Sequence, residues 1–119
     1  MAKHGKLAIL GASGAIGRAL TARAMSDAWE VVALDLQATL TAYPPPDGVM
    51  SIAVDLRDPQ SVEDAMTAVG DIDGFVNLAG FMSAIRPLTE TPLDDFDEVI
   101  MGNLRGAFIA ARAALPHLV

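Results

Sequence analysis

Short apolar runs alternate with segments of helical periodicity along the chain. The runs have the aliphatic and β-branched composition of strands that are buried on both faces of a sheet. We therefore predict four strands, at residues 6–10, 31–35, 50–54 and 74–78. After the first run, Ile16, Leu20 and Ala24 recur four positions apart, which predicts that a helix follows the first strand.

The third strand leads into a second predicted helix. Asp58 followed by Pro59 is typical of a helix N-cap with proline at the first helical position. Val62, Met66 and Val69 then mark the face that the helix should bury.

Thr91 and Pro92 repeat this start signal before the last predicted helix. Thr91 and Asp94 have the spacing of a capping box, in which the threonine would cap the first turn. We expect a long helix that reaches about Leu115 and is ended by Pro116.

A loop should separate the second and third strands, because residues 41–48, TAYPPPDG, contain three consecutive prolines. Strands that alternate with helices at this spacing require right-handed crossovers and a parallel sheet covered on both faces. The prediction is an α/β fold, a Rossmann-like doubly wound sheet with strand order 3-2-1-4 that stops after the fourth helix. It forms one domain over residues 1–119.

Composition narrows the function classes. Hydrophobic residues make up 52% of the chain, yet no apolar run approaches the roughly 20 residues that span a bilayer. No cleavage site follows the first run, so we expect a cytoplasmic protein without a membrane partner. The formal net charge of -7 opposes binding to nucleic acid. Cysteine is absent, and His4 and His117 have no carboxylate at ligand spacing, so no metal site is expected.

The segment GASGAIG carries the clearest sign of chemistry. Gly11, Gly14 and Gly17 lie between the first strand and the first helix. A diphosphate needs glycine there, because the turn can require positive φ, the phosphates approach bare backbone, and the amides of the helix N-terminus attract anions. By themselves, three glycines also fit an ordinary tight turn. The flanking strand and helix favour a dinucleotide site.

Asp35 ends the second strand, 18 positions after Gly17. A carboxylate at about this distance accepts hydrogen bonds from the adenosine ribose in dinucleotide-binding folds. It would also repel a 2′-phosphate, and no basic residue follows it in LQATLTA. NAD(H) is therefore favoured over NADP(H), with Arg18 as the nearby cation that could reverse the preference.

Together these motifs resemble the short-chain dehydrogenase/reductase family over essentially the whole chain. GASGAIG is similar to the family's glycine-rich loop, Asp55-Leu56 to its adenine-contacting pair, and NLAG at 77–80 to its Asn-Asn-Ala-Gly signature, while Asn103 matches its helix-four asparagine. The resemblance implies an NAD(H)-dependent oxidoreductase that acts on a small-molecule alcohol or carbonyl substrate. It implies these cofactor-binding residues: Gly11, Ser13, Gly14, Ala15, Ile16, Gly17, Asp35, Leu36, Asp55, Leu56, Asn77, Ala79 and Gly80.

The chain departs from the family pattern at two positions. Ala15 stands where the commoner subclass has glycine, and the spacing here is closer to the extended, epimerase-like subclass. Leu78 replaces the second asparagine of the strand-four signature, which would remove a backbone-supporting hydrogen bond.

Asn103 is unusual because helical periodicity places its amide on an apolar face. The glycines that flank it, Gly102 and Gly106, suggest a close backbone approach or a local distortion of the helix. The resemblance favours a kink with a water site for proton relay, and the alternative is a core asparagine bonded to a neighbouring carbonyl. The other members of the face are Phe96, Val99, Ile100, Ala107, Ala110 and Ala114.

The family's catalytic Tyr-x-x-x-Lys and serine are not found among these residues. Tyr43 is followed at the required spacing by Asp47, and the only lysines are Lys3 and Lys6. We expect the chain to carry the dinucleotide-binding half of such an enzyme, with Asn103 as its one supporting catalytic residue. A non-catalytic NAD-binding module and an epimerase-like member remain alternatives. The resemblance also implies a homo-oligomer through the long fourth helix.

Overall fold

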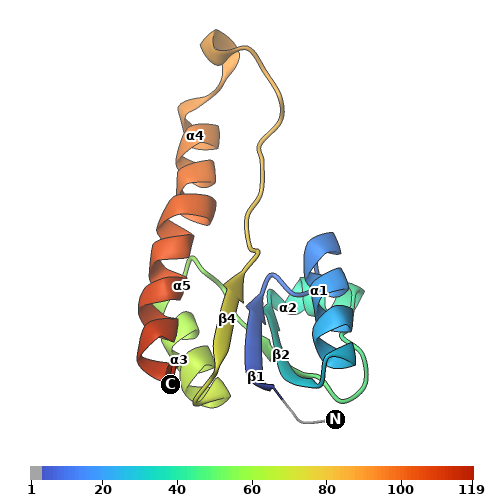
Figure 1. Ribbon diagram of the computed structural model, residues 1–119. Coiled ribbons are helices and arrows are strands. Elements are labelled where there is room, and N and C mark those ends of the chain that lie inside the picture. Colours follow the sequence, from blue (N-terminus) through green and yellow to red (C-terminus); the bar gives the residue numbers. More distant parts are fainter. Residues whose placement is uncertain (1–3) are drawn as a thin grey trace.

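The computed structural model describes residues 4–119, which form a parallel sheet between two layers of helices (Figure 1). The strand order is β3-β2-β1-β4, and every pairing is parallel. The predicted fold class and strand order are therefore confirmed. The strands are β1 (Gly5–Leu10), β2 (Trp29–Asp35), β3 (Met50–Ala53) and β4 (Gly74–Asn77).

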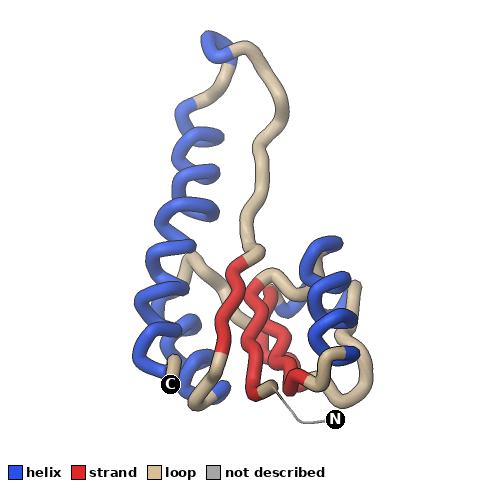
Figure 2. Tube along the Cα trace, viewed as in Figure 1, coloured by secondary structure: helices blue, strands red, loops and turns tan. Residues whose placement is uncertain are grey.

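Helices cover both faces of this sheet (Figure 2). The helices α1 and α2 lie on one side, and α3 and α5 lie on the other, as the right-handed crossovers require (Figure 1). The helical segments are α1 (Ala15–Ser26), α2 (Gln37–Ala42), α3 (Pro59–Val69), η1 (Leu88–Glu90), α4 (Leu93–Val99), the π-helical η2 (Ile100–Arg105), α5 (Gly106–Ala114) and η3 (Leu115–His117).

The core follows from the alternation of side chains along the strands. Ala8 and Leu10 of β1 face α3 and α5, whereas Leu7 and Ile9 face α1. Both sets are buried. Because both faces of the central strands are covered, their sequences are nearly all apolar.

The structure confirms the predicted start and buried face of α3. The Asp58 carboxylate accepts a hydrogen bond from the Gln60 N–H, and Pro59 occupies the first turn. Val62, Met66 and Val69 are each less than 4% exposed.

The predicted face of α1 is only partly right. Ala24 is buried, but Ile16 is 71% exposed, and the buried positions next to it are Gly17 and Thr21. The small residues Gly17 and Thr21 allow α1 to approach the sheet closely. The buried face of the helix therefore consists of these two residues and Ala24.

The sequence pattern does not anticipate helix α2. Its last two residues, Thr41 and Ala42, fall in the stretch expected to be a loop. The prolines exclude helix only from residue 44 onward, so a short helix fits before them.

The long helical segment from Leu93 to Ala114 was predicted, but its start was not. Pro92, not Thr91, is at the cap position, and no side chain caps the first turn. The Thr91 hydroxyl donates instead to the Pro87 carbonyl, because η1 brings that carbonyl within 3.0 Å. The predicted capping box is therefore wrong.

The apolar face of this helix is covered only toward its C-terminal end. Ala110 and Ala114 are buried against the sheet, whereas Phe96 is 57% and Ile100 is 38% exposed. The α4 end projects beyond the sheet beside the segment that follows β4 (Figures 1 and 2). Within residues 4–119, no helix is both long and apolar enough to cross a membrane.

Candidate functional site

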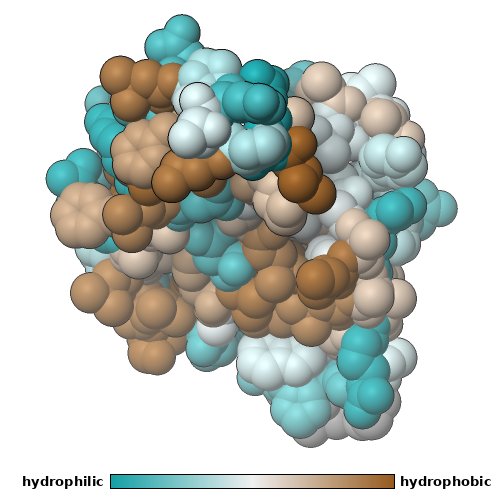
Figure 3. All heavy atoms as spheres, turned by 90° about the horizontal axis from the view of Figure 1, so that it is seen from above, coloured by the Kyte–Doolittle hydropathy of each residue, from teal (hydrophilic) through white to brown (hydrophobic). Residues whose placement is uncertain are grey.

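Three strand ends bring the sequence motifs together at one edge of the sheet. Leu10 pairs with Leu34 on one side and with Asn77 on the other, so the residues that follow each strand are neighbours. They border a cleft of about 570 Å³. Its lining residues are Leu10, Gly11, Gly14, Asp35, Leu36, Thr39, Val54, Asp55, Leu56, Arg57, Leu78, Ala79, Gly80, Phe81 and Gly102. Apolar side chains gather on this face of the molecule (Figure 3).

Gly11, in the turn after β1, and Gly17, in the first turn of α1, are both required by geometry. Gly11 has φ of 78°, a left-handed conformation, and a Cβ there would lie 2.8 Å from the Ala79 nitrogen. A Cβ on Gly17 would collide with the carbonyl oxygen of Gly11 and the backbone of Ala12. The loop therefore packs tightly between α1 and the turn after β4.

The N-terminus of α1 opens at the cleft. Gly14 is its cap residue and lines the cleft, and no side chain caps the first turn. The N–H groups of a first helical turn have no partners within the helix and lie at the positive end of its dipole. This end of α1 is suited to bind a phosphate group.

Asp35 is oriented by two backbone N–H groups. One carboxylate oxygen accepts from Ser13 at 3.0 Å, and the other accepts from Leu36 at 2.8 Å. Ser13 is part of the loop between β1 and α1 and is 3% exposed. Because each carboxylate oxygen has a second lone pair, Asp35 can still accept hydrogen bonds from a diol in the cleft.

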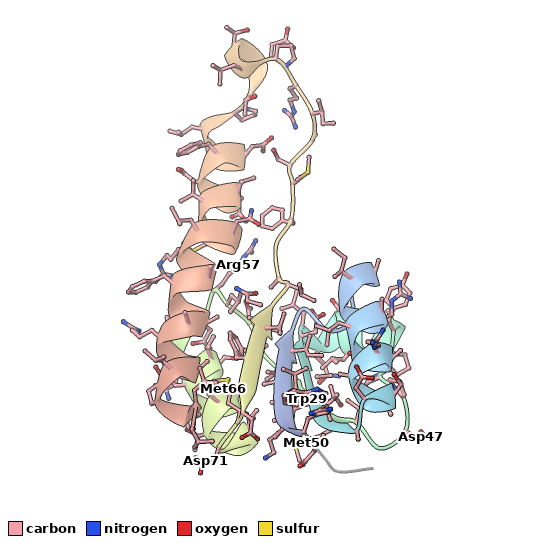
Figure 4. All side chains as sticks on the ribbon, in the orientation of Figure 1. Trp29, Asp47, Met50, Arg57, Met66 and Asp71 are labelled. Atoms are coloured by element: carbon pink, nitrogen blue, oxygen red, sulfur yellow. The ribbon has the colours of Figure 1, made fainter. Side chains whose placement is uncertain are left out.

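The turn after β3, which is next to the end of β2, forms another wall of the cleft. The Arg57 N–H donates to the Asp55 carboxylate at 3.0 Å, and the side chain of Leu56 packs against the core and faces Gly106. The Arg57 guanidinium forms an ion pair with Glu98 of α4. Figure 4 shows Arg57 between the sheet edge and the long helix. This wall presents apolar surface backed by a fixed cation, which suits a planar heterocycle.

The end of β4 is rigid although its second asparagine is missing. The Asn77 side-chain oxygen accepts from the Ala79 N–H at 2.9 Å, and the Leu78 N–H donates to the Leu10 carbonyl at 2.8 Å. The Leu78 side chain packs against the core on the α1 side. Leucine at this position therefore replaces a polar contact with apolar packing.

Asn103 fastens the long helix to the segment after β4. Its side-chain oxygen accepts from the Phe81 N–H at 3.0 Å, and its amide nitrogen donates to the carbonyls of Phe81 and Val99, each at 2.8 Å. The Phe81 ring lies against Gly102. The expected distortion is present as the π-helical segment. The amide is bonded to carbonyls, as the alternative expects, but Asn103 is only partly buried and is not a core residue. The proton-relay role stays a prediction.

The predicted site residues thus divide into two groups. Those that line the cleft are Gly11, Gly14, Asp35, Leu36, Asp55, Leu56, Ala79 and Gly80. Those outside the lining are Ser13, Ala15, Ile16, Gly17, Asn77 and Asn103. Ser13, Gly17, Asn77 and Asn103 shape the backbone around the cleft.

Sequence reasoning missed several lining residues, including Thr39, Arg57 and Phe81. Arg57 and Phe81 directly follow the predicted Leu56 and Gly80, so their place at a strand end was a usable signal. Met82 and Arg86, which follow Phe81 in the same segment, do not line the cleft. Met82 is 79% exposed, and Arg86 pairs with Asp95 at 3.2 Å, away from the cleft lining.

No metal-binding cluster accompanies the cleft in the described part of the chain. Groups of three or more His, Asp or Glu side chains that could hold an ion are absent from residues 4–119. His4 stacks on Trp29, with ring centroids 5.5 Å apart.

Comparison with known proteins decides the family. The family model for short chain dehydrogenases matches residues 6–119. The chain belongs to the short-chain dehydrogenase family. It is 37% identical to a 2-(R)-hydroxypropyl-CoM dehydrogenase of Xanthobacter autotrophicus, over 93% of this chain and 50% of that protein.

Other members of the family agree with this assignment. A 2-dehydro-3-deoxy-L-rhamnonate dehydrogenase (NAD(+)) of Sphingomonas is 32% identical, over 97% of this chain and 49% of that protein. A solved dehydrogenase/reductase of Sinorhizobium meliloti superposes with a TM-score of 0.80 at 31% identity, over 98% of this chain and 50% of that one. The chain spans about half the length of these short-chain dehydrogenases.

Proposed function

We propose that the cleft binds a nicotinamide dinucleotide and prefers NAD(H) to NADP(H). The observation that carries the proposal is the Asp35 carboxylate, which lines the cleft and is bonded to the glycine loop through the Ser13 N–H. A ribose on Asp35 and a diphosphate on the start of α1 would then lie side by side.

The residues around the cleft have separate tasks in this proposal. Gly11 and Gly14 expose backbone to the diphosphate, and Leu36 and Leu56 flank the adenine. Ala79, Gly80 and their support from Asn103 shape the far end of the cleft. The bound cofactor would supply the hydride chemistry, whereas these residues bind and orient it.

The preference for NAD(H) follows from charge. The Asp35 carboxylate accepts hydrogen bonds from ribose hydroxyls but would repel a 2′-phosphate in a partly shielded site. The Sphingomonas relative, whose name states NAD(+), supports this choice. For the whole protein we propose hydride transfer with an alcohol or carbonyl substrate, in line with the relatives named dehydrogenases.

Titration of NADH and NADPH against the wild type and Asp35→Asn tests the proposal. Asparagine keeps the shape of the side chain and can still accept from Ser13, but it removes the charge and the oxygen that accepts from Leu36. Hydrogen bonds to a charged group contribute roughly 1.5 to 3 kcal/mol, so the variant should lose about one to two decades of preference for NADH.

Asp47→Asn is the matched control, because it makes the same charge change in the loop between α2 and β3 (Figure 4). It should leave the preference unchanged. Equal affinity of the wild type for both cofactors, or an equal effect of the two substitutions, would contradict the role of Asp35.

A further inference from the structure

Arg18 and Tyr43 form a contact at the rim of the cleft that the proposed function does not use. The guanidinium carbon of Arg18 lies 4.4 Å from the centroid of the Tyr43 ring. Arg18 Nε also points to the Gly14 carbonyl, at a long 3.4 Å. The residues that line the cleft include Gly14 but not Arg18, so the guanidinium lies outside it.

The position of Tyr43 is fixed from several directions. Its carbonyl accepts from the Ser13 hydroxyl at 3.1 Å, and its N–H donates to the Thr39 carbonyl at 2.9 Å. Three prolines follow it and restrict the backbone. These contacts hold the backbone of Tyr43, and its half-exposed ring lies against the Arg18 guanidinium.

The buried Ser13 links Tyr43 to Asp35. The Ser13 hydroxyl donates to Tyr43, and the Ser13 N–H donates to the Asp35 carboxylate. The cation on α1 and the carboxylate that selects the ribose are thus positioned by one linked set of contacts. A guanidinium released from the ring would stay within one helical turn of the cleft, because the Arg18 N–H bonds to Gly14.

We infer that Tyr43 is a selectivity residue, which retains Arg18 outside the cleft and so prevents it from pairing with a 2′-phosphate. The inference rests on the proposed function, because it concerns the cofactor that the cleft accepts. With Arg18 retained, the Asp35 charge near the ribose stays uncompensated. Without the ring, Arg18 can turn toward a phosphate and pair with it.

Replacing Tyr43 tests this on the protein expressed from its complete reading frame. Tyr43→Leu removes the ring but keeps an apolar side chain. A cation–π contact at an exposed site contributes an amount equivalent to a two- to fivefold change in affinity. NADPH should therefore bind about two- to fivefold more tightly to this variant, at low ionic strength, while NADH binding is unchanged.

Three matched variants complete the design. Tyr43→Phe keeps the ring and should behave as the wild type. Arg18→Met should change NADPH affinity less than about twofold, because the cation is already outside the cleft. In the Arg18→Met background, Tyr43→Leu should have no effect, which separates a released cation from a general loosening of the loop.

Each outcome bears on one claim. Unchanged NADPH affinity in Tyr43→Leu, or a gain that persists in the Arg18→Met background, overturns the inference while leaving the proposed function intact. Failure of the wild type to bind either dinucleotide overturns the proposed function and this inference with it.

Discussion

At the scale of single residues, Gly11 and Gly17 are constrained differently. Gly11 needs its left-handed φ. Gly17 must lack a side chain, because the backbone of Gly11 and Ala12 occupies the space where a Cβ would lie. Gly14 has neither constraint, because its φ is -72° and the nearest atom to an added Cβ is 3.5 Å away. The need for positive φ in the turn could be expected from the sequence, but not which glycine carries it or what surrounds Gly17.

This difference predicts the stability of two variants. Gly17→Ala should destabilise the protein by about 1–3 kcal/mol, since the backbone on both sides must shift to admit the methyl group. Gly14→Ala should be tolerated. Chemical denaturation of the two variants and the wild type would measure the effect, and equal stability of Gly17→Ala and Gly14→Ala would contradict the packing assigned to Gly17.

At the scale of elements, all four strands predicted from the sequence and the predicted start of α3 are present in the structure. These elements carry strong local signals, such as the aliphatic strands and the cap at Asp58. The capping box at Thr91 failed because a carbonyl from η1 competes for the hydroxyl. The exposure of Phe96 was missed because periodicity shows which positions share a face but not which element covers it.

For Asn103 as well, one part of the local structure could be predicted from the sequence and another part could not. Its flanking glycines indicated a distortion, and the structure has a π-helical segment there. Its partner Phe81 lies 22 positions earlier in the chain, so no local pattern could identify the contact. The cofactor-binding roles of the cleft residues stay predictions.

Asn103→Leu should release the segment after β4. The substitution removes the acceptor of the Phe81 N–H and the donor to the Phe81 carbonyl. Losing these two hydrogen bonds, with a net contribution of about 1 kcal/mol each, should speed hydrogen exchange of the Phe81 amide by roughly thirtyfold. Leu104→Ala, at a neighbouring position that is 67% exposed, is the control. Unchanged protection of Phe81 in the Asn103 variant would show that the amide does not fasten this segment.

At the scale of the whole molecule, the described residues form a cleft, but the tyrosine and the lysine among them do not meet in it. Tyr43 is positioned by Ser13 and its ring stacks with Arg18. The lysine of the described residues, Lys6, donates to the carbonyl of Val69, the last residue of α3. Neither side chain lines the cleft.

These 119 residues alone should therefore show no hydride transfer on alcohols or ketones. General acid–base catalysis needs a group within hydrogen-bond reach of the reacting oxygen. The assay is NADH consumption by the purified chain with carbonyl substrates, beside a sample inactivated by heat. Sustained turnover above that background would show that these residues catalyse hydride transfer, contrary to the prediction.

The central claim is that the carboxyl edge of the sheet binds a nicotinamide dinucleotide, and amide NMR during an NADH titration tests it most directly. Saturable shifts should appear at Gly11, Gly14 and Asp35, and at the other cleft-lining amides. The amides of Glu63 and Asp64, on the exposed face of α3, should not move. Shifts that centre on α3, or an absence of saturable shifts around the glycine loop and Asp35, would contradict the account.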